Sequence, residues 1–349
     1  MTETSISSHF VPGGTNVPVL EVDDLRVEFR TPYGVVQAVN GISYAINQGE
    51  TLAILGESGS GKSVSVQAVM GILDTPPGFV TGGSIKFHGN DMLAMTSEQQ
   101  RLVRGPGVAM IFQDALSALN PVFSVGHQIA EMYTAHIGLS RKEAKARAIE
   151  LMERVRIPAA RERVNDYPHQ FSGGMRQRVM IAMALALGPE ILIADEPTTA
   201  LDVTVQAQIM ELLGDLQSET GMGLILITHD LGVVNEVADR VMVMYAGKIV
   251  ESGTIDEVFT SPTHPYTRGL MASVPHAESK GVRLNPISGQ PPNLAAIPAG
   301  CAFHPRCPHA RFDSAAQDAR DCRVDAPPLR EFGLGRASAC HYSEELYGA

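Results

Sequence analysis

Several ordinary features are missing from this sequence of 349 residues. Tryptophan is absent, aromatic residues make up only 5% of the chain, and the first 300 residues contain no cysteine. No run approaches the ~18 consecutive apolar residues that a membrane-spanning helix needs. The N-terminus lacks the basic start and apolar run of a secretory signal. These absences indicate a cytosolic chain, so any role at a membrane must come through a partner.

Positive charge is also in short supply. The chain has 27 Lys and Arg against 38 Asp and Glu, for a net charge of −11. Proteins that bind nucleic acids normally neutralise phosphates with clustered basic residues, so we expect no nucleic-acid partner. Apolar residues make up 44% of the chain, which is enough to bury a core.

Strand-like and helix-like segments alternate along most of the chain. Short apolar runs at 51–56, 191–197 and 223–230 read as buried strands, and 241–253 reads as a hairpin turning at Ala246–Gly247. Strands that alternate with helices predict an α/β fold with a mostly parallel sheet. Helical patterns dominate residues 97–188, which we interpret as an insertion into that sheet.

The two ends of the chain differ from its middle in composition. Residues 1–18 are polar, contain Gly and Pro, and predict a flexible tail. After residue 258 the sequence becomes rich in Pro, Gly and Ser. We therefore expect a main domain over 19–258 and a loop-rich extension over 259–349.

The segment GESGSGKS, residues 56–63, matches the phosphate-binding P-loop pattern in full. It follows a predicted strand and precedes a helix-like segment, which favours a nucleotide cradle over a chance glycine-rich turn. Lys62 is expected to reach the β- and γ-phosphates, and Ser63 to hold Mg²⁺. The predicted cradle consists of Gly56, Glu57, Ser58, Gly59, Ser60, Gly61, Lys62, Ser63 and Val64.

Polar residues follow other predicted strands. Asp195 and Glu196 end the segment ILIADEP, at the strand edge where ligands bind in open α/β sheets. Asp195 suits Mg²⁺ coordination, and Glu196 suits the general base that activates water. A solvated acid pair is the alternative reading. We also predict that His229 contacts the γ-phosphate and that Gln113 touches Mg²⁺ or the attacking water, although both are ordinary strand-end residues by type.

The segment FSGGMRQR, residues 171–178, predicts a helix start. Ser172 is a good N-cap, and the glycines expose backbone N–H groups at the positive end of the helix dipole. A simple capping turn is the alternative reading. Because the chain already has one phosphate cradle, we interpret this second anion site as one that serves the nucleotide of a neighbouring subunit.

These motifs, in this order, resemble the ATP-binding subunit of ABC transporters over about residues 19–258. The strings ADEPTTALD and THD belong to the resemblance, and SPTHPYTRGL and GCAFHPRC resemble the C-terminal extension of the dipeptide/oligopeptide importer branch. The resemblance implies a P-loop NTPase core of RecA-like fold with an inserted helical subdomain. The signature departs from the commoner Leu-Ser-Gly-Gly-Gln, because Phe171 and Met175 replace the outer residues.

The resemblance also implies roles for further residues. Two subunits would form a head-to-tail sandwich in which Ser172, Gly173 and Gly174 face the nucleotide of the partner, with Asp202 on the loop at the interface. Tyr33 is the candidate for stacking on adenine. The implied assembly has two membrane permeases, a second ATPase that is identical or homologous, and an extracytoplasmic binding protein, with this chain at the cytoplasmic face.

The four cysteines, Cys301, Cys307, Cys322 and Cys340, all lie in the extension. Disulfides are disfavoured in the cytosol, which leaves a metal site. The gaps of 5, 14 and 17 residues contain no C-x-x-C pair, and His304, His309 and His341 could replace thiolates as zinc ligands. The extension resembles others that look able to bind [4Fe–4S]. We favour that cluster, in a structural role, and keep Zn²⁺ as the alternative.

The sequence thus predicts an ATPase that powers import of di- or oligopeptides. Three alternatives stay open: an importer for nickel, glutathione or a sugar, a soluble ABC protein acting on nucleic acid or the ribosome, and a regulatory ATP-binding module without transport. This subunit does not meet the cargo, so its sequence does not identify the cargo.

Overall fold

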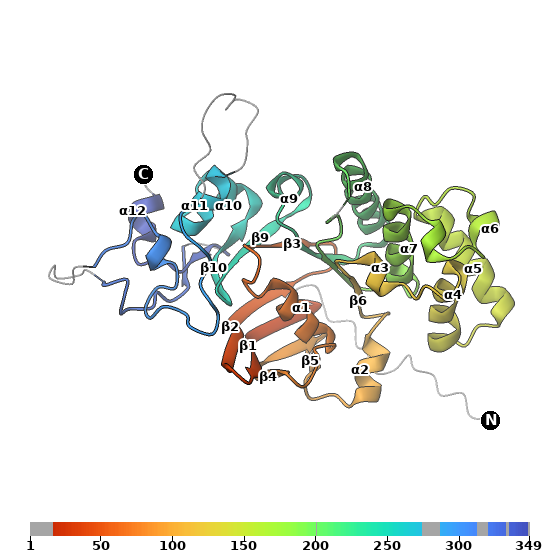
Figure 1. The fold of residues 1–349 in the computed structure, drawn as a ribbon, viewed down its shortest axis with the longest axis horizontal. Helices are drawn as coiled ribbons and strands as arrows, with labels where there is room; N and C mark the ends of the chain where they lie inside the picture. The colour runs from red at the N-terminus through yellow and green to blue at the C-terminus, as the bar shows by residue number, and fades with distance from the viewer. Residues whose placement is uncertain (1–16, 200, 274–286, 313–319, 333–334, 348–349) are drawn as a thin grey trace.

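Two β-sheets form the frame of the chain (Figure 1). The computed structural model describes residues 17–199, 201–273, 287–312, 320–332 and 335–347, so most of the predicted N-terminal tail lies outside the described residues. The smaller sheet is antiparallel, in the order β2-β1-β4-β5. Its strands are β1 (Leu20–Thr31), β2 (Gly34–Ile46), β4 (Gly78–Phe87) and β5 (Asn90–Asp91).

The larger sheet has the order β11-β12-β10-β9-β3-β8-β7-β6, and its five strands from β9 to β6 run parallel. Its strands are β3 (Thr51–Leu55), β6 (Val108–Ile111), β7 (Ile191–Asp195), β8 (Gly223–Ile227), β9 (Arg240–Tyr245), β10 (Lys248–Thr254), β11 (Arg330–Glu331) and β12 (Ala337–Ser338). The predicted α/β fold with a mostly parallel sheet is confirmed.

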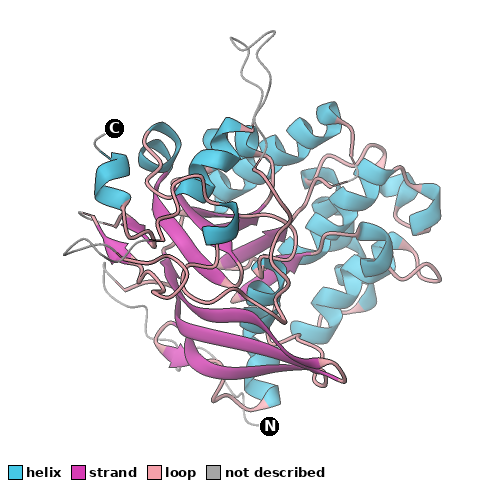
Figure 2. Cartoon of the chain, turned by 60° about the vertical axis from the view of Figure 1, so that its left-hand side comes forward, coloured by secondary structure: helices cyan, strands magenta, loops and turns pink. Residues whose placement is uncertain are grey.

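Burial on both faces explains why the parallel strands are continuously apolar. In β7, Ile191 and Ile193 pack into the core shared with α1 (Lys62–Met70) and the antiparallel sheet. Leu192 and Ala194 point to the opposite face, into the core shared with the helices. Alternate side chains of one strand therefore pack into two separate cores, because successive residues point to opposite faces of the sheet. Figure 2 shows the antiparallel sheet apart from the helices that cover the other face of the central sheet.

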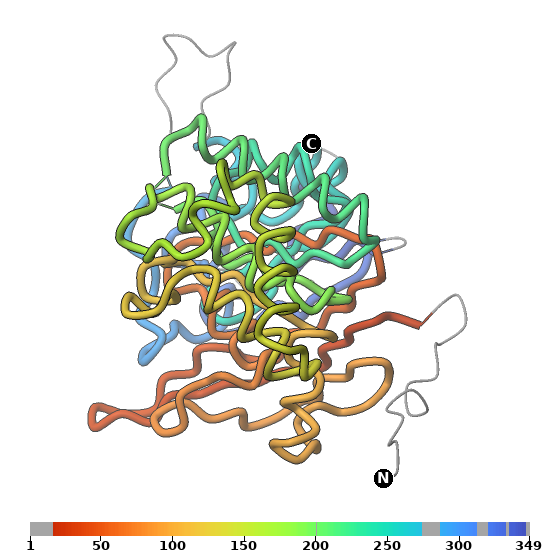
Figure 3. Tube along the Cα trace, turned by 90° about the vertical axis from the view of Figure 1, so that its right-hand side faces the viewer, coloured from red at the N-terminus to blue at the C-terminus, as the bar shows by residue number. Residues whose placement is uncertain are grey.

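The inserted helical block is built from α3 (Ala115–Ala118), α4 (Val125–His136), α5 (Arg141–Arg154), α6 (Ala160–Arg163) and α7 (Gly173–Leu185), with α8 (Val203–Thr220) beside it. Figure 3 shows this block in front of the sheets. Ser140 begins α5 with a capping box to Glu143, as the local sequence favours. The strand expected just before Gln113 is β6, which lies within 97–188 and pairs with β7 in the central sheet, and the bounds of the helical subdomain stay a prediction.

The C-terminal part carries α9 (Leu231–Val237), α10 (Ile255–Thr260), α11 (Pro265–Ala272) and α12 (Ser343–Tyr347), and α2 (Ser97–Val103) lies beside the antiparallel sheet (Figure 1). The predicted hairpin is confirmed: Ala246 and Gly247 join β9 to β10 with φ of 49° and 78°. Strand β12 pairs with β10, so the extension continues the central sheet.

Candidate nucleotide site

The P-loop spans residues 56–61, between the end of β3 and the start of α1. Two of its glycines are required by the backbone. Gly56 and Gly61 have φ of +151° and +104°, and a Cβ on either would collide with a carbonyl oxygen, of Met244 and Ala38 respectively. The loop therefore keeps its tight path only with glycine at both positions.

Lys62 is buried beneath this loop. Its ammonium donates to the carbonyl oxygens of Gly56 (2.8 Å) and Glu57 (3.1 Å). Burial lowers the pKa of Lys62, while the carboxylates of Glu196, Asp195 and Glu57 oppose that shift. A lysine held by backbone carbonyls next to a glycine-rich turn can exchange them for phosphate oxygens without leaving its place.

The Ser60 hydroxyl supports the fit of a nucleotide to this loop. Its oxygen is buried and has no hydrogen-bond partner among the residues that the structure describes. A buried unpaired hydroxyl costs free energy, and a phosphate oxygen in the cradle offers the missing acceptor.

Ser63 and Asp195 meet where the predictions place the metal ion. The Ser63 hydroxyl donates to the Asp195 carboxylate at 3.0 Å, although the two residues are 132 positions apart. Burial raises the pKa of Asp195, and the Ser63 hydrogen bond opposes this shift. A hydroxyl and a carboxylate are hard oxygen ligands of the kind that Mg²⁺ prefers beside nucleotide phosphates, so these two side chains fit that ion.

Glu196 is the centre of a polar cluster drawn from three strand ends. Gln113, after β6, donates its amide to the Glu196 carboxylate at 2.9 Å. The His229 ring, after β8, lies 3.9 Å from the same carboxylate. The structure thus brings together the three side chains that the sequence predicted as catalytic. Glu196 itself has φ of +46°, an uncommon left-handed conformation for a non-glycine residue.

Thr199 is a member of this cluster that the sequence reasoning missed. Its hydroxyl donates to the Glu196 carboxylate at 2.9 Å, across the turn that follows β7. The available signal was the short spacing in DEPTT, because a Thr three residues beyond an acid can fold back on it in a turn.

The Ser-Gly-Gly segment lies elsewhere in the fold. Ser172 caps α7 by accepting from the Met175 N–H at 3.4 Å, as predicted. A Cβ on Gly174 would meet the side chain of Val205, which lies on α8, at 2.6 Å. Asp202 caps α8 by accepting from the Val205 N–H at 2.9 Å. Figure 1 shows α7 in the helical block, away from α1. Gly174 therefore lies against α8, and Ser172 is exposed at the start of α7.

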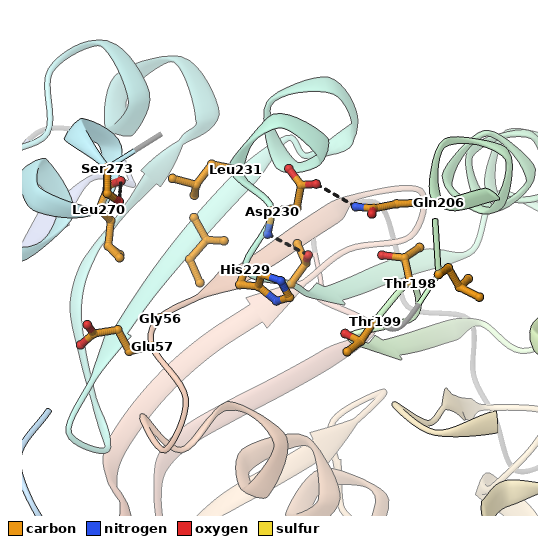
Figure 4. A pocket seen from close by; sticks show the side chains of 13 residues that line it. Gly56, Glu57, Thr198, Thr199, Gln206, His229, Asp230, Leu231, Leu270 and Ser273 are labelled. Carbon is orange, nitrogen blue, oxygen red and sulfur yellow. Dashed lines mark hydrogen bonds between the residues drawn. The ribbon is translucent and has the colours of Figure 1, made fainter. Parts of the chain in front are cut away.

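A cavity of about 540 Å³ opens beside the cradle (Figure 4). Gly56, Thr198, His229 and Leu270 are among its lining residues. Asp230 forms another part of the wall, where its carboxylate caps α9 and accepts from the Gln206 amide at 2.7 Å. Access to the strand ends is thus open on the side of the P-loop that faces α11.

Tyr33 lies at the turn between β1 and β2 and is 98% exposed. The structure assigns it no contact that selects a base, so its stacking on adenine stays a prediction.

The four cysteines converge in the extension, although the sequence separates them widely. The Cys301 N–H donates to the Cys322 carbonyl at 2.9 Å. Burial, together with neighbouring thiols, raises the pKa of Cys307 to about 12 and of Cys340 to about 11. However, within the described ranges no group of three or more His, Cys, Asp or Glu side chains is arranged to hold a metal ion. The predicted cluster geometry is therefore not met here.

Two of the three histidines that could replace cysteine as zinc ligands, His304 and His341, have a ring nitrogen beside a backbone carbonyl. A ring nitrogen of His304 lies 2.9 Å from the Cys301 carbonyl, and one of His341 lies 2.9 Å from the Asp325 carbonyl. Each ring is thus oriented by a backbone oxygen through one of its nitrogens, a contact that metal-ligating histidines also make.

Comparisons with known proteins agree with this geometry. Residues 39–199 match the family model described as ABC transporter, and residues 250–312 match the model described as oligopeptide/dipeptide transporter, C-terminal region. The chain is 55% identical to the oligopeptide transport ATP-binding protein OppD of Bacillus subtilis, over 84% of this chain and 82% of the relative. It is 50% identical to OppD of Salmonella typhimurium, over 94% and 95%.

A solved structure is similar as well. The ATP-binding cassette MJ0796, solved as a dimer in a post-hydrolysis state with ADP and phosphate, has a TM-score of 0.61 and 26% identity, covering 68% of this chain and 98% of that one. Among the described residues, no helix is both long enough and apolar enough to span a membrane. By sequence, fold and site, this chain belongs to the ABC transporter family, as an ATP-binding cassette of the branch that carries the oligopeptide/dipeptide transporter C-terminal region.

Proposed function

We propose that this chain is the ATP-hydrolysing subunit of an importer for di- and oligopeptides. It works at the cytoplasmic face of the membrane with two permease subunits and a second ATPase, and an extracytoplasmic binding protein delivers the cargo. The relatives named for oligopeptide transport support the cargo class, because they match 84% and 94% of the chain. Residues 250–312, in the extension, also match the oligopeptide/dipeptide transporter model.

The cluster around Glu196 carries the hydrolytic part of the proposal. Glu196 accepts the proton of the attacking water, and His229, beside it, holds the γ-phosphate and the water in place. Gln113 keeps the Glu196 carboxylate oriented through its 2.9 Å hydrogen bond. Ser63, Asp195 and Gln113 would hold Mg²⁺, which would supply positive charge beside the nucleotide phosphates.

The separation of the two anion sites supports a composite catalytic centre. Ser172 and the glycines after it present the N-terminus of α7, whereas Lys62 lies in the cradle at the start of α1. In a head-to-tail pair, the α7 terminus of one subunit closes over the triphosphate held by the other. Asp202, which caps α8 next to Gly174, lies on the loop between the two.

An apolar groove supports the permease contact. It has a volume of about 380 Å³ and lies between α1–α2 and the helical block, with Ile72, Met110, Phe112 and Met183 among its lining residues. Phe112 precedes Gln113, so the groove adjoins the catalytic cluster. We propose that a segment of the permease fills it, because an occupant here contacts both the core and the helical block and can sense their closure.

Reconstitution with the two permease subunits of an oligopeptide importer tests the proposal. We expect ATP-dependent uptake of oligopeptides into proteoliposomes, and no uptake of nickel, glutathione or sugars. Ile72→Glu, on the groove surface, should reduce uptake at least tenfold and leave basal hydrolysis unchanged, since it adds an unpaired charge to an apolar contact. Val324→Glu, a substitution of an exposed valine in the extension, is the control. Co-purification with nucleic acid or ribosomes instead of permeases would contradict the assignment.

We also propose that the four cysteines hold a [4Fe–4S] cluster as a structural cofactor, with Zn²⁺ as the competing occupant. The gathering of three half-buried thiols and one buried thiol supports this, although their side chains must rearrange to ligate a metal. Protein purified without oxygen should contain iron and sulfide in equal amounts and show the broad visible absorbance of a cluster. Cys307→Ser should lose both signals. Stoichiometric zinc without sulfide would replace the cluster by zinc, and metal-free protein would refute both.

A further inference from the structure

The C-terminal extension contacts the P-loop at Glu57. The Arg306 guanidinium donates to both carboxylate oxygens of Glu57, at 2.6 and 2.9 Å. The backbone N–H of Glu57 donates to the Tyr266 hydroxyl at 2.8 Å. Arg306 and Tyr266 follow Glu57 by 249 and 209 positions, so two distant segments hold the side chain and the backbone of one loop residue.

The Arg306 side chain is enclosed, unlike most arginines in surface ion pairs. Only 5% of it is exposed, its Nε donates to the Ser288 carbonyl at 3.0 Å, and its guanidinium lies 5.8 Å from the Tyr245 ring centre. Hydrogen bonds to Glu57 raise the pKa of Arg306, so it stays charged. A bidentate arginine–carboxylate pair whose arginine is buried has a defined geometry, whereas exposed pairs contribute little.

An aromatic cluster fixes the position of this arginine. Tyr245 from β9, Tyr266 from α11 and Phe303 from the extension pack with ring centres 4.7 to 5.4 Å apart. Arg306 ends the short 3₁₀ turn His304–Arg306, directly after Phe303 and between Cys301 and Cys307. Docking of the extension therefore determines where the guanidinium lies.

Glu57 is directly connected to the phosphate cradle. Its carbonyl oxygen accepts from Lys62 at 3.1 Å and from the Ser60 N–H at 3.2 Å. Its carboxylate is one of the three acids that act on the ammonium of Lys62. Without a cation beside it, this carboxylate would lie unpaired at the edge of a site that has to accept a triphosphate, and like charges repel strongly where water is partly excluded.

We propose that Arg306, together with Tyr266, is a positioning residue for the P-loop, so that nucleotide affinity depends on the docked C-terminal extension. Arg306 draws the Glu57 carboxylate away from the phosphates and neutralises it, and Tyr266 fixes the start of the loop. The inference rests on the proposed ATPase function and adds a control by the extension that the P-loop pattern does not contain.

Further contacts show that the extension is anchored firmly enough for this role. Glu251, fully buried in β10, accepts from the Thr263 N–H and hydroxyl and from the His264 N–H, at 2.7 to 2.9 Å. These bonds hold the segment that leads into α11 and so place Tyr266. The central sheet is thereby linked to the contacts that Tyr266 and Arg306 make with Glu57.

Calorimetric titration of the full chain with MgATP tests the inference. Arg306→Gln should weaken ATP binding about tenfold, because the Glu57 carboxylate becomes unpaired beside the phosphates. KM for ATP should rise by a similar factor while kcat changes less than threefold. In the double variant Glu57→Gln/Arg306→Gln the charge is removed on both sides, and we expect the affinity to return to within threefold of the unmodified chain.

Arg311→Gln is the matched control, because Arg311 makes a bidentate pair with Glu345 on the surface of the same extension. It should leave ATP affinity unchanged. Unaltered affinity in Arg306→Gln, or a double variant as weak as the single one, would overturn the inference and reduce Arg306 to a packing role. Failure of the unmodified chain to bind ATP would instead refute the proposed function, so the two failures are distinguishable.

Discussion

Glu196→Gln is expected to retain MgATP and to lower hydrolysis by about 10²–10⁴-fold, the usual contribution of a general base. The amide has the shape of the carboxylate but cannot take the proton of the attacking water. In the structure one carboxylate oxygen, Oε2, accepts from both Gln113 and Thr199. An amide oxygen in that place can keep both bonds, so the water loses its base while the cradle around Lys62 is unchanged. With hydrolysis blocked, ATP should hold two subunits together.

Glu190→Gln is the matched control for this experiment. Glu190 directly precedes β7, at the opposite end of the strand that leads to Glu196, and its side chain contacts His88 outside the cluster. Phosphate release measures turnover, and gel filtration with MgATP measures dimer formation. Normal turnover in Glu196→Gln would remove Glu196 from its role, and a monomer with bound ATP would argue against the closed pair.

The second large effect is expected when two inactive variants are mixed. Lys62→Ala should bind ATP about 10–100-fold more weakly, because a buried charged donor is lost. Ser172→Ala should bind ATP in the cradle but fail to hydrolyse it. In an equal mixture, half of the pairs contain one chain of each kind, and one of their two sites is complete only if Ser172 acts across the interface. Activity should then recover to about a quarter of the unmodified level.

The controls separate catalysis from helix capping. Ser172 caps α7, so Ser172→Ala also costs about 1 kcal/mol of stability. Ser140→Ala removes an equivalent cap from α5 in the same helical block and should leave ATPase activity intact. Gly174 is not used, because a side chain there would collide with Val205 within one subunit. If the mixture stays as inactive as its components, the catalytic site is contained in one chain.

Local sequence alone was sufficient for the features that short-range rules govern. Gly56 and Gly61 are required by the backbone of a single tight loop, and Ser172 caps the helix that begins at the next residue. Asp195, Glu196 and His229 were placed at strand ends by apolar runs, and parallel strands bring their carboxyl ends to one edge. Spacing and periodicity act over a few residues, so they can be read from the chain directly.

Tertiary structure decided the features that depend on distant segments. No local pattern joins Arg306 to Glu57, and the apolar run before Gln113 indicates a strand without saying that it pairs with β7. The cysteines came together as their count suggested, but the arrangement of their side chains is set by packing in the extension and did not form a metal site among the described residues. Contacts between residues hundreds of positions apart depend on how separate elements pack, because that packing, and not the neighbouring sequence, determines which side chains become neighbours.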